Sequence, residues 1–122
     1  MEEYLEVMRR TVELAETCMD GLHHIHIRLN EGLMEDTLYL LEDIVCGFCQ
    51  ITDSIQVLEF FFLDNEPLDM TTKVEMALHD ILSAYEHHDI NLASYSLSSL
   101  LLPSFQSWNN GIMRTFHPHI LS

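Results

Sequence analysis

The chain has 122 residues, of which 20 are acidic and 5 are Lys or Arg, so its formal net charge is −15 with the histidines neutral. This length is typical of one domain, and we treat residues 1–122 as a single unit. The acidic surplus repels phosphate backbones and anionic lipid head groups, which argues against nucleic acid and membranes as partners.

Three features of the chain predict a cytoplasmic protein. The first residues, Met1 to Leu14, are acidic and periodic, without the basic start and continuous apolar run of a signal peptide. The three cysteines are an odd number that makes no disulfide framework and suits a reducing compartment. The uncharged stretch from Ile90 to Met113 carries too many serines and asparagines for a membrane span.

The first predicted helix covers residues 2–30. Apolar residues recur from Leu5 to Leu29 at alternating spacings of three and four, which is the pattern of an amphipathic helix. The same periodicity places His26 on the buried face. Gly32 suits the left-handed position just past a helix end, and so short a loop makes the next helix an antiparallel neighbour.

The second predicted helix, residues 33–63, is the longest and forms the centre of the fold. Opposite its core stripe lie Glu35, Tyr39, Glu42, Cys46, Cys49, Asp53, Gln56 and Phe60. A solvated face does not normally gather Tyr, two Cys and Phe, and the residues from Val57 to Leu63 are apolar around nearly the whole helix. We expect this face to be covered in part by the C-terminal tail, by a second copy or by a foreign helix.

Pro67 predicts the end of the central helix, because a proline cannot continue it. A third helix is then predicted over residues 70–87. Asp69, Thr71 and Thr72 are all residue types that cap helix N-termini.

Asp89 predicts the N-cap of a fourth helix over residues 90–109, with a kink before Pro103. Residues 112–121 are predicted to form an apolar tail. No strand pattern occurs in the sequence. We therefore expect an all-α antiparallel four-helix bundle, with two long helices followed by two shorter ones and the tail.

Three stretches of the second half resemble a known family. They are Leu63-Asp64-Asn65-Glu66, the pattern Ala77…Ala84-Tyr85-Glu86…Asp89, and Leu101-Leu102-Pro103 followed by Trp108. Together they are similar to an uncharacterised family of small helical proteins from spore-forming and related low-GC bacteria. That family carries acidic residues just before the proline of its fourth helix, where this chain has Ser98, Ser99 and Leu100. The resemblance implies a four-helix bundle and no known activity.

The motifs of common helical enzymes are missing from the sequence. No glutamate is followed by a histidine three residues later, which excludes the ligand set of di-iron bundles. The string Cys46-Gly47-Phe48-Cys49 falls in mid-helix, where the backbone amides are already bonded and cannot stabilise a thiolate. Neither a Gly-x-Ser-x-Gly elbow nor a phosphate-binding glycine loop is present. We expect no enzymatic activity and no cofactor.

Metal binding is the alternative that the sequence leaves open. His23 and His26 lie three residues apart on one helix, and Cys46 and Cys49 have the same spacing on the next. Such pairs bind metals when a neighbouring helix supplies further ligands. Histidines favoured at a helix end by the dipole, with His26 packed in the core, explain the histidine pair without a metal.

The function predicted from the sequence is a non-enzymatic protein-binding module, an adaptor or export-chaperone-like bundle that docks an amphipathic helix of another protein or a second copy of itself. The residues predicted to bind the partner are apolar and belong to the central helix or the tail. They are Tyr39, Val57, Phe60, Phe61 and Phe116.

Overall fold

The computed structural model describes residues 2–63 and 65–121, with the side chain of Glu66 left aside. The elements in chain order are α1 (Glu2–Asn30), the 3-10 turn η1 (Glu35–Thr37), α2 (Leu38–Val57), the 3-10 turn η2 (Glu59–Phe61), α3 (Glu66–Glu86), α4 (Ile90–Tyr95), the π-helical turn η3 (Ser96–Leu101) and α5 (Leu102–Ile120). No β-strand occurs among these residues. The predicted all-α fold is confirmed.

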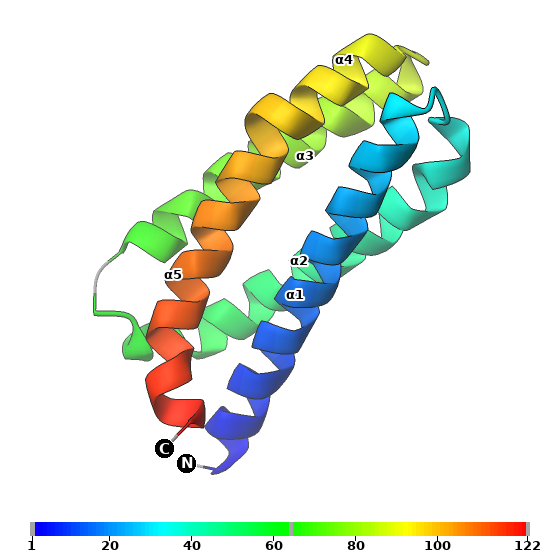
Figure 1. Ribbon diagram of the computed structural model, residues 1–122. Helices are drawn as coiled ribbons and strands as arrows, with labels where there is room; N and C mark the ends of the chain where they lie inside the picture. Colours follow the sequence, from blue (N-terminus) through cyan, green and yellow to red (C-terminus); the bar gives the residue numbers. More distant parts are fainter. Residues whose placement is uncertain (1, 64, 122) are drawn as a thin grey trace.

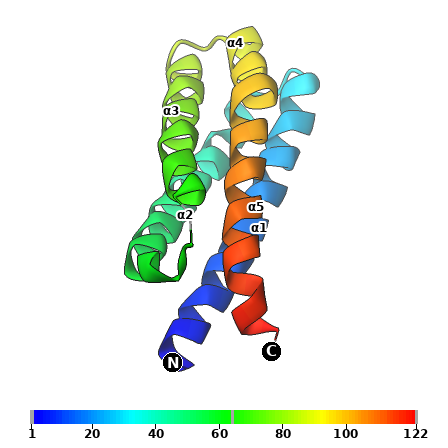
Figure 2. The ribbon, with the colours of Figure 1, turned by 90° about the vertical axis from the view of Figure 1, so that its left-hand side faces the viewer.

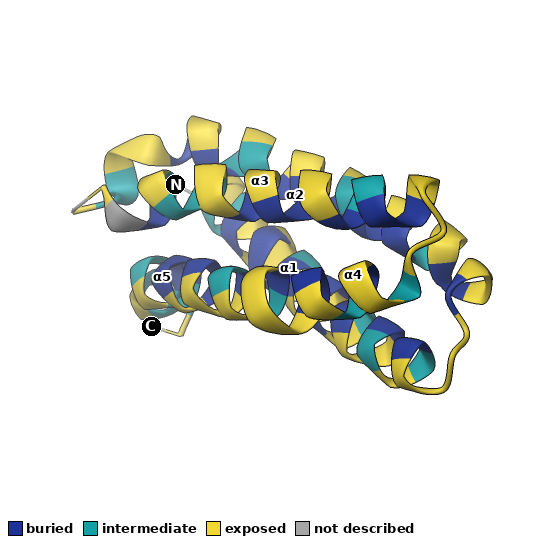
Figure 3. Cartoon of the chain, turned by 90° about the horizontal axis from the view of Figure 1, so that it is seen from above, coloured by how far each residue is buried: buried dark blue, intermediate teal, exposed yellow. Residues whose placement is uncertain are grey.

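The helices form an antiparallel bundle in which α4, η3 and α5 run on as one rod. Helix α1 packs against α2 and α5, and α3 packs against the last rod, whereas α2 and α3 share fewer contacts. Both chain ends lie at the same end of the bundle (Figures 1 and 2). Each helix turns its buried side inward and its exposed side to solvent (Figure 3), as its amphipathic pattern requires.

The end of α1 is built as the sequence predicts. Gly32 has a φ of 83°, the Leu33 N–H donates to the carbonyl of Arg28 at 2.9 Å, and the Gly32 N–H donates to that of Leu29 at 3.0 Å. These paired bonds are a Schellman motif, which satisfies the last carbonyls of the helix. The loop that follows turns the chain back along α1.

The placement of His26 on the buried face is wrong. Ile25 occupies the core position that follows Leu22, and His26 is only half-buried. A period of 3.6 residues admits either position after Leu22. The branched apolar side chain takes it because burying an imidazole nitrogen without a partner is costly, and His26 already has Nδ1 buried without a hydrogen-bond partner.

Helix α2 is shorter than predicted at both ends. At its start, the buried Thr37 donates its hydroxyl proton to the carbonyl of Met34 at 2.6 Å. The Tyr85 hydroxyl lies 2.6 Å from the same Thr37 oxygen and therefore acts as the donor in that bond. This buried pair ties the turn before α2 to the end of α3. At the other end, η2 bends the chain so that Phe62 stacks on Phe116, with ring centroids 5.5 Å apart.

Helix α3 begins at Glu66, four residues earlier than predicted. Pro67 lies in its first turn, where the missing N–H would have had no partner and the fixed φ already suits a helix. The Asp69 N–H donates to the carbonyl of Asn65 at 2.8 Å, inside the turn that we expected to be a loop. Asp69, Thr71 and Thr72 are thus helical residues rather than N-caps.

Pro103 does not break the last rod, because the preceding residues adopt the π-helical turn η3. Here the Leu102 N–H bonds to the carbonyl of Leu97, five residues back, in the π pattern. The Ser104 hydroxyl donates to the carbonyl oxygen of Leu100 at 2.7 Å. Asp89 caps the rod as predicted, accepting the Leu92 N–H at 3.0 Å.

The predicted C-terminal tail is the second half of α5. The helix continues through Gly111 and Pro118 to Ile120, and Phe116 is fully buried in the core. The last rod, residues 90–120, is therefore longer than α2, contrary to the predicted order of lengths. The prediction that the fourth helix ends at residue 109 is wrong, because the helix continues through the glycine and the proline that follow.

Gly111 lies where α5 crosses the start of α3, and a Cβ there would stand 2.8 Å from Pro67 Cγ and 3.1 Å from its Cβ. The proline ring is rigid, so the helices must separate. We expect Gly111→Ala to lower the free energy of unfolding by about 1 kcal/mol, because overpacking outweighs the better helix propensity of alanine. Urea unfolding followed by circular dichroism measures the change.

The matched control for Gly111→Ala is Gly21→Ala in α1. A Cβ at Gly21 would stand 3.0 Å from Cδ1 of Ile44, the flexible end of a side chain that can rotate away. We expect this variant to be as stable as the wild type or slightly more stable. Equal losses from both substitutions would contradict a tight crossing at Pro67.

Candidate functional site

The outer face of α2 carries exposed apolar residues that no other helix of the bundle covers. We define it as the exposed residues Tyr39, Glu42, Cys46, Cys49, Asp53, Gln56, Val57 and Phe60. The apolar members are well exposed, with 67% of the surface of Tyr39, 58% of Val57 and 64% of Phe60 accessible. The C-terminal segment, one of the covers expected from the sequence, does not bury these residues.

One end of this face joins a cluster of aromatic rings at the base of the bundle. Tyr4 of α1 meets Phe60 and Phe61 edge-on, with ring centroids 5.3 and 5.8 Å apart. Phe61 in turn meets His119 of α5 at 5.1 Å. The contacts with Tyr4 and Phe61 restrain the position of the exposed Phe60 ring.

The predicted partner-binding residues are divided between surface and core. Tyr39, Val57 and Phe60 lie on the outer face of α2. Phe61 is half-buried next to Phe60. Phe116 is fully buried and stacks on Phe62, so it belongs to the core and not to an exposed surface. The second half of α5 thus packs against Phe62, which follows η2, and leaves Phe60 exposed.

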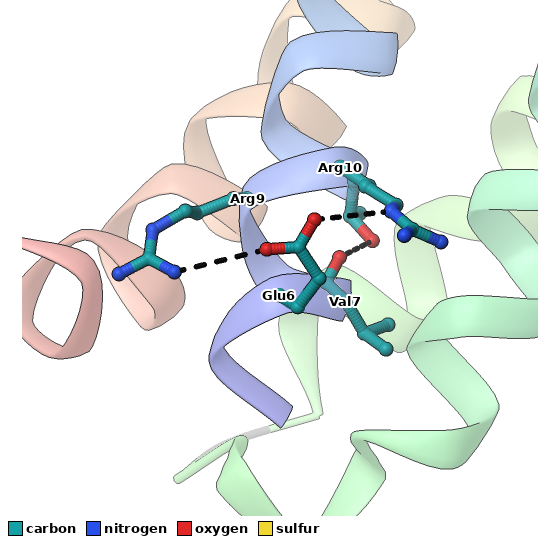
Figure 4. A network of polar contacts seen from close by, with 5 residues as sticks. Glu6, Val7, Arg9 and Arg10 are labelled. Atoms are coloured by element: carbon teal, nitrogen blue, oxygen red, sulfur yellow. Dashed lines mark hydrogen bonds and ion pairs between the residues drawn. The ribbon is translucent and has the colours of Figure 1, made fainter. Parts of the chain in front are cut away.

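The charged residues of the stretch that contains α2 have one sign. No Lys, Arg or His occurs between Arg28 and Lys73, a stretch that contains ten acidic residues. The three arginines of α1 are paired locally: Glu6 accepts from Arg10 Nε at 3.3 Å and lies 3.9 Å from Arg9 Nη1 (Figure 4), and Arg28 Nη1 lies 3.3 Å from Glu31. The outer face of α2 therefore presents apolar groups in an acidic field.

The four candidate metal ligands do not form a site. Cys46 and Cys49 are free thiols on the outer face of α2, and His23 is exposed on α1. His26 lies with Nε2 3.5 Å from the side-chain nitrogen of Asn30. Among the described residues, no group of three or more His, Cys, Asp or Glu side chains is placed to hold a metal ion.

Cys18, which sequence reasoning did not single out, is chemically distinct from the other two cysteines. It is buried between α1 and α2, and a Cβ built on Gly47 would stand 2.7 Å from its sulfur. Burial raises the pKa of Cys18 from its ordinary value of 9.0 to about 11. The group is therefore a packed, protonated thiol at neutral pH and not a nucleophile.

A groove between α3 and the last rod was also missed from the sequence. It encloses about 440 Å³ and is lined by residues of α3, η3 and α5. The serines of η3 and α5 were used in the sequence analysis only to argue against a membrane span. Their position along one edge of α3 is a tertiary property that helical periodicity does not reveal.

A family model described as "Domain of unknown function (DUF8042)" matches residues 6–111, which is most of the chain. The expected similarity to an uncharacterised family is confirmed at this level. No curated protein and no solved structure matches the chain. None of the described helices has the length and apolar character that crossing a membrane requires.

Proposed function

The chain belongs to the DUF8042 family, and we propose that it is a non-enzymatic protein-binding module that docks a basic amphipathic helix of a partner protein on the outer face of α2. The observation that carries this proposal is the exposure of Tyr39, Val57 and Phe60 on a face whose own charged residues, Glu42 and Asp53, are both acidic. An apolar stripe in a field of one sign fits a helix with apolar anchors and opposite charges.

The dimensions of the face define the occupant. Tyr39 and Val57 are 18 residues apart on α2, which corresponds to about 27 Å. A partner helix of about five turns spans this distance. Glu42 and Asp53 lie between the apolar ends, so the partner carries Lys or Arg in its middle turns and apolar anchors near both ends.

Charge favours a foreign partner over a second copy. Each chain has a formal net charge of −15, so two chains repel each other. An antiparallel pair of α2 helices crossing at Cys46 and Cys49 would also place Glu42 opposite Asp53. A basic helix removes both conflicts.

The proposal assigns the module to the cytoplasm, where three free thiols stay reduced. It assigns no catalytic residue and no cofactor, and it names neither nucleic acid nor membrane as a partner because of the acidic charge. The metal-binding alternative is less favoured, since the described residues offer no complete ligand group.

The test uses a fluorescently labelled 18-residue Leu/Lys amphipathic peptide and measures its anisotropy as protein is added. We expect Tyr39→Lys to weaken binding about tenfold, because it removes an anchor and adds a repelling charge. Tyr95→Lys is the matched control: it makes the same change at an exposed tyrosine of α4. Its affinity should stay within about twofold of the wild type.

Two outcomes would overturn the proposal. Equal weakening by Tyr39→Lys and Tyr95→Lys would show that the peptide responds only to net charge. A wild-type mass of two chains in sedimentation, reduced to one by Tyr39→Lys, would make a second copy the occupant of the face.

A further inference from the structure

The groove between α3 and the last rod has one apolar rim on each side. Met76 of α3 is 63% exposed and Leu100 of η3 is 41% exposed, and both line the groove. Between the rims, the wall formed by the last rod consists largely of small side chains, including Ser99 and Ser107. These serines leave a channel open where longer side chains would have closed it.

Two opposite charges mark the groove along α3. Lys73 and Asp80 both line it and are seven residues, or about 10.5 Å, apart on the helix. Lys73 is the only Lys or Arg between Arg28 and Arg114. In the part of the chain whose side chains the structure describes, neither Lys73 nor Asp80 has an ion-pair partner within 4 Å.

We propose that this groove is a second docking site, which takes an amphipathic helix bearing an acidic residue against Lys73 and a basic residue seven positions later against Asp80. Residues seven apart on a docked helix span the same distance as Lys73 and Asp80. The apolar side chains of the docked helix that lie between its two charged residues enter the channel between Met76 and Leu100. The flexible side chain of Met76 can adjust to their shape. An antiparallel helix with the basic residue first would make the same two charge pairs. The helix dipole favours an acidic residue near the N-terminus, so we place the docked helix parallel to α3.

The groove shares no residue with the outer face of α2, so it does not depend on the function proposed above. A module with two separate docking surfaces can hold two partner helices at once. The second site thereby gives this bundle the geometry of an adaptor that bridges two proteins.

The test uses two designed peptides of 14 residues with identical composition, both with Leu and Ala on the apolar face. One has Glu followed seven residues later by Lys, and the other has the two exchanged. By fluorescence anisotropy, we expect the Glu-first peptide to bind the wild type about fivefold more tightly. The double variant Lys73→Glu/Asp80→Lys should invert this preference. Unchanged preference in the double variant would overturn the proposal.

A matched pair of variants locates the bound peptide. Ser99→Leu fills the groove and should weaken the Glu-first peptide at least tenfold, whereas Ser98→Leu, at the neighbouring exposed serine outside the groove, should not. Circular dichroism verifies that both variants are folded. Equal affinities of the two variants, or a wild-type dimer that only Ser99→Leu dissociates, would refute a foreign helix in the groove. A Leu/Lys peptide that still binds the Ser99→Leu variant would show that the outer face of α2 is intact.

Discussion

Replacing Trp108 by alanine is expected to lower the free energy of unfolding by about 3–5 kcal/mol, a large share of the total stability of a domain of this size. Trp108 is fully buried where α2, α3 and α5 meet. Its ring centroid lies 5.0 Å from that of Phe48 and 5.3 Å from that of Phe105. Its Nε1 donates to the Thr71 hydroxyl at 2.9 Å. Truncation removes all three contacts and leaves a cavity.

Urea unfolding followed by circular dichroism measures this loss, since Trp108 is the only tryptophan and its fluorescence disappears with it. Thr71→Val is the matched control, because it keeps a side chain of similar size and removes the acceptor of the indole N–H, together with the hydroxyl's own bond to the Pro67 carbonyl at 3.2 Å. We expect it to cost about 1–2 kcal/mol, the penalty of a buried donor left without a partner. A loss below about 1 kcal/mol for Trp108→Ala would be incompatible with its position in the core.

Stability is expected to fall as the pH rises from about 9 to about 11, by on the order of 2 kcal/mol from Cys18 alone. The pKa of Cys18 is raised by burial to about 11 from an ordinary value of 9.0. Above pH 9 the unfolded chain loses the thiol proton while the folded chain keeps it. The unfolded state therefore gains stability across this window, and the contribution of Cys18 is complete near pH 11.

Urea melts at pH 8, 9, 10 and 11 decide this prediction. Cys18→Ala should flatten the curve between pH 9 and 11, although it lowers stability at every pH because it leaves a small cavity. Cys46→Ala, at an exposed thiol, should keep the wild-type slope. Burial also raises the pKa of Tyr85, so every variant still loses some stability above pH 10. Identical slopes for wild type and Cys18→Ala would mean that the thiol is accessible to solvent.

Helix existence and direction followed from the sequence because they depend on local periodicity. The apolar positions of α1, the left-handed Gly32 after it and the cap at Asp89 are set by residues within one or two turns of each other. The exposed face of α2 was found in the same way, as the side opposite its core stripe. The absence of strands and the acidic surface were likewise fixed by residue order and composition alone.

Helix boundaries depended on contacts between residues far apart in the sequence. The fourth helix was predicted to end at residue 109, yet α5 passes through Gly111 and Pro118 because Phe116 gains more from burial in the core than the helix loses at a glycine or a proline. Pro103 is tolerated because a π turn and the Ser104 hydroxyl serve the carbonyls around it.

The division of the predicted partner-binding residues was decided by the tertiary structure. Phe60 and Phe116 are alike as local signals, since each is an aromatic residue in an apolar stretch. Only the bend at η2 determines that Phe62 and Phe116 stack inside while Phe60 faces solvent. The groove beside Lys73 and Asp80 arises in the same way, because two helices distant in sequence must meet before small side chains on one of them leave a channel.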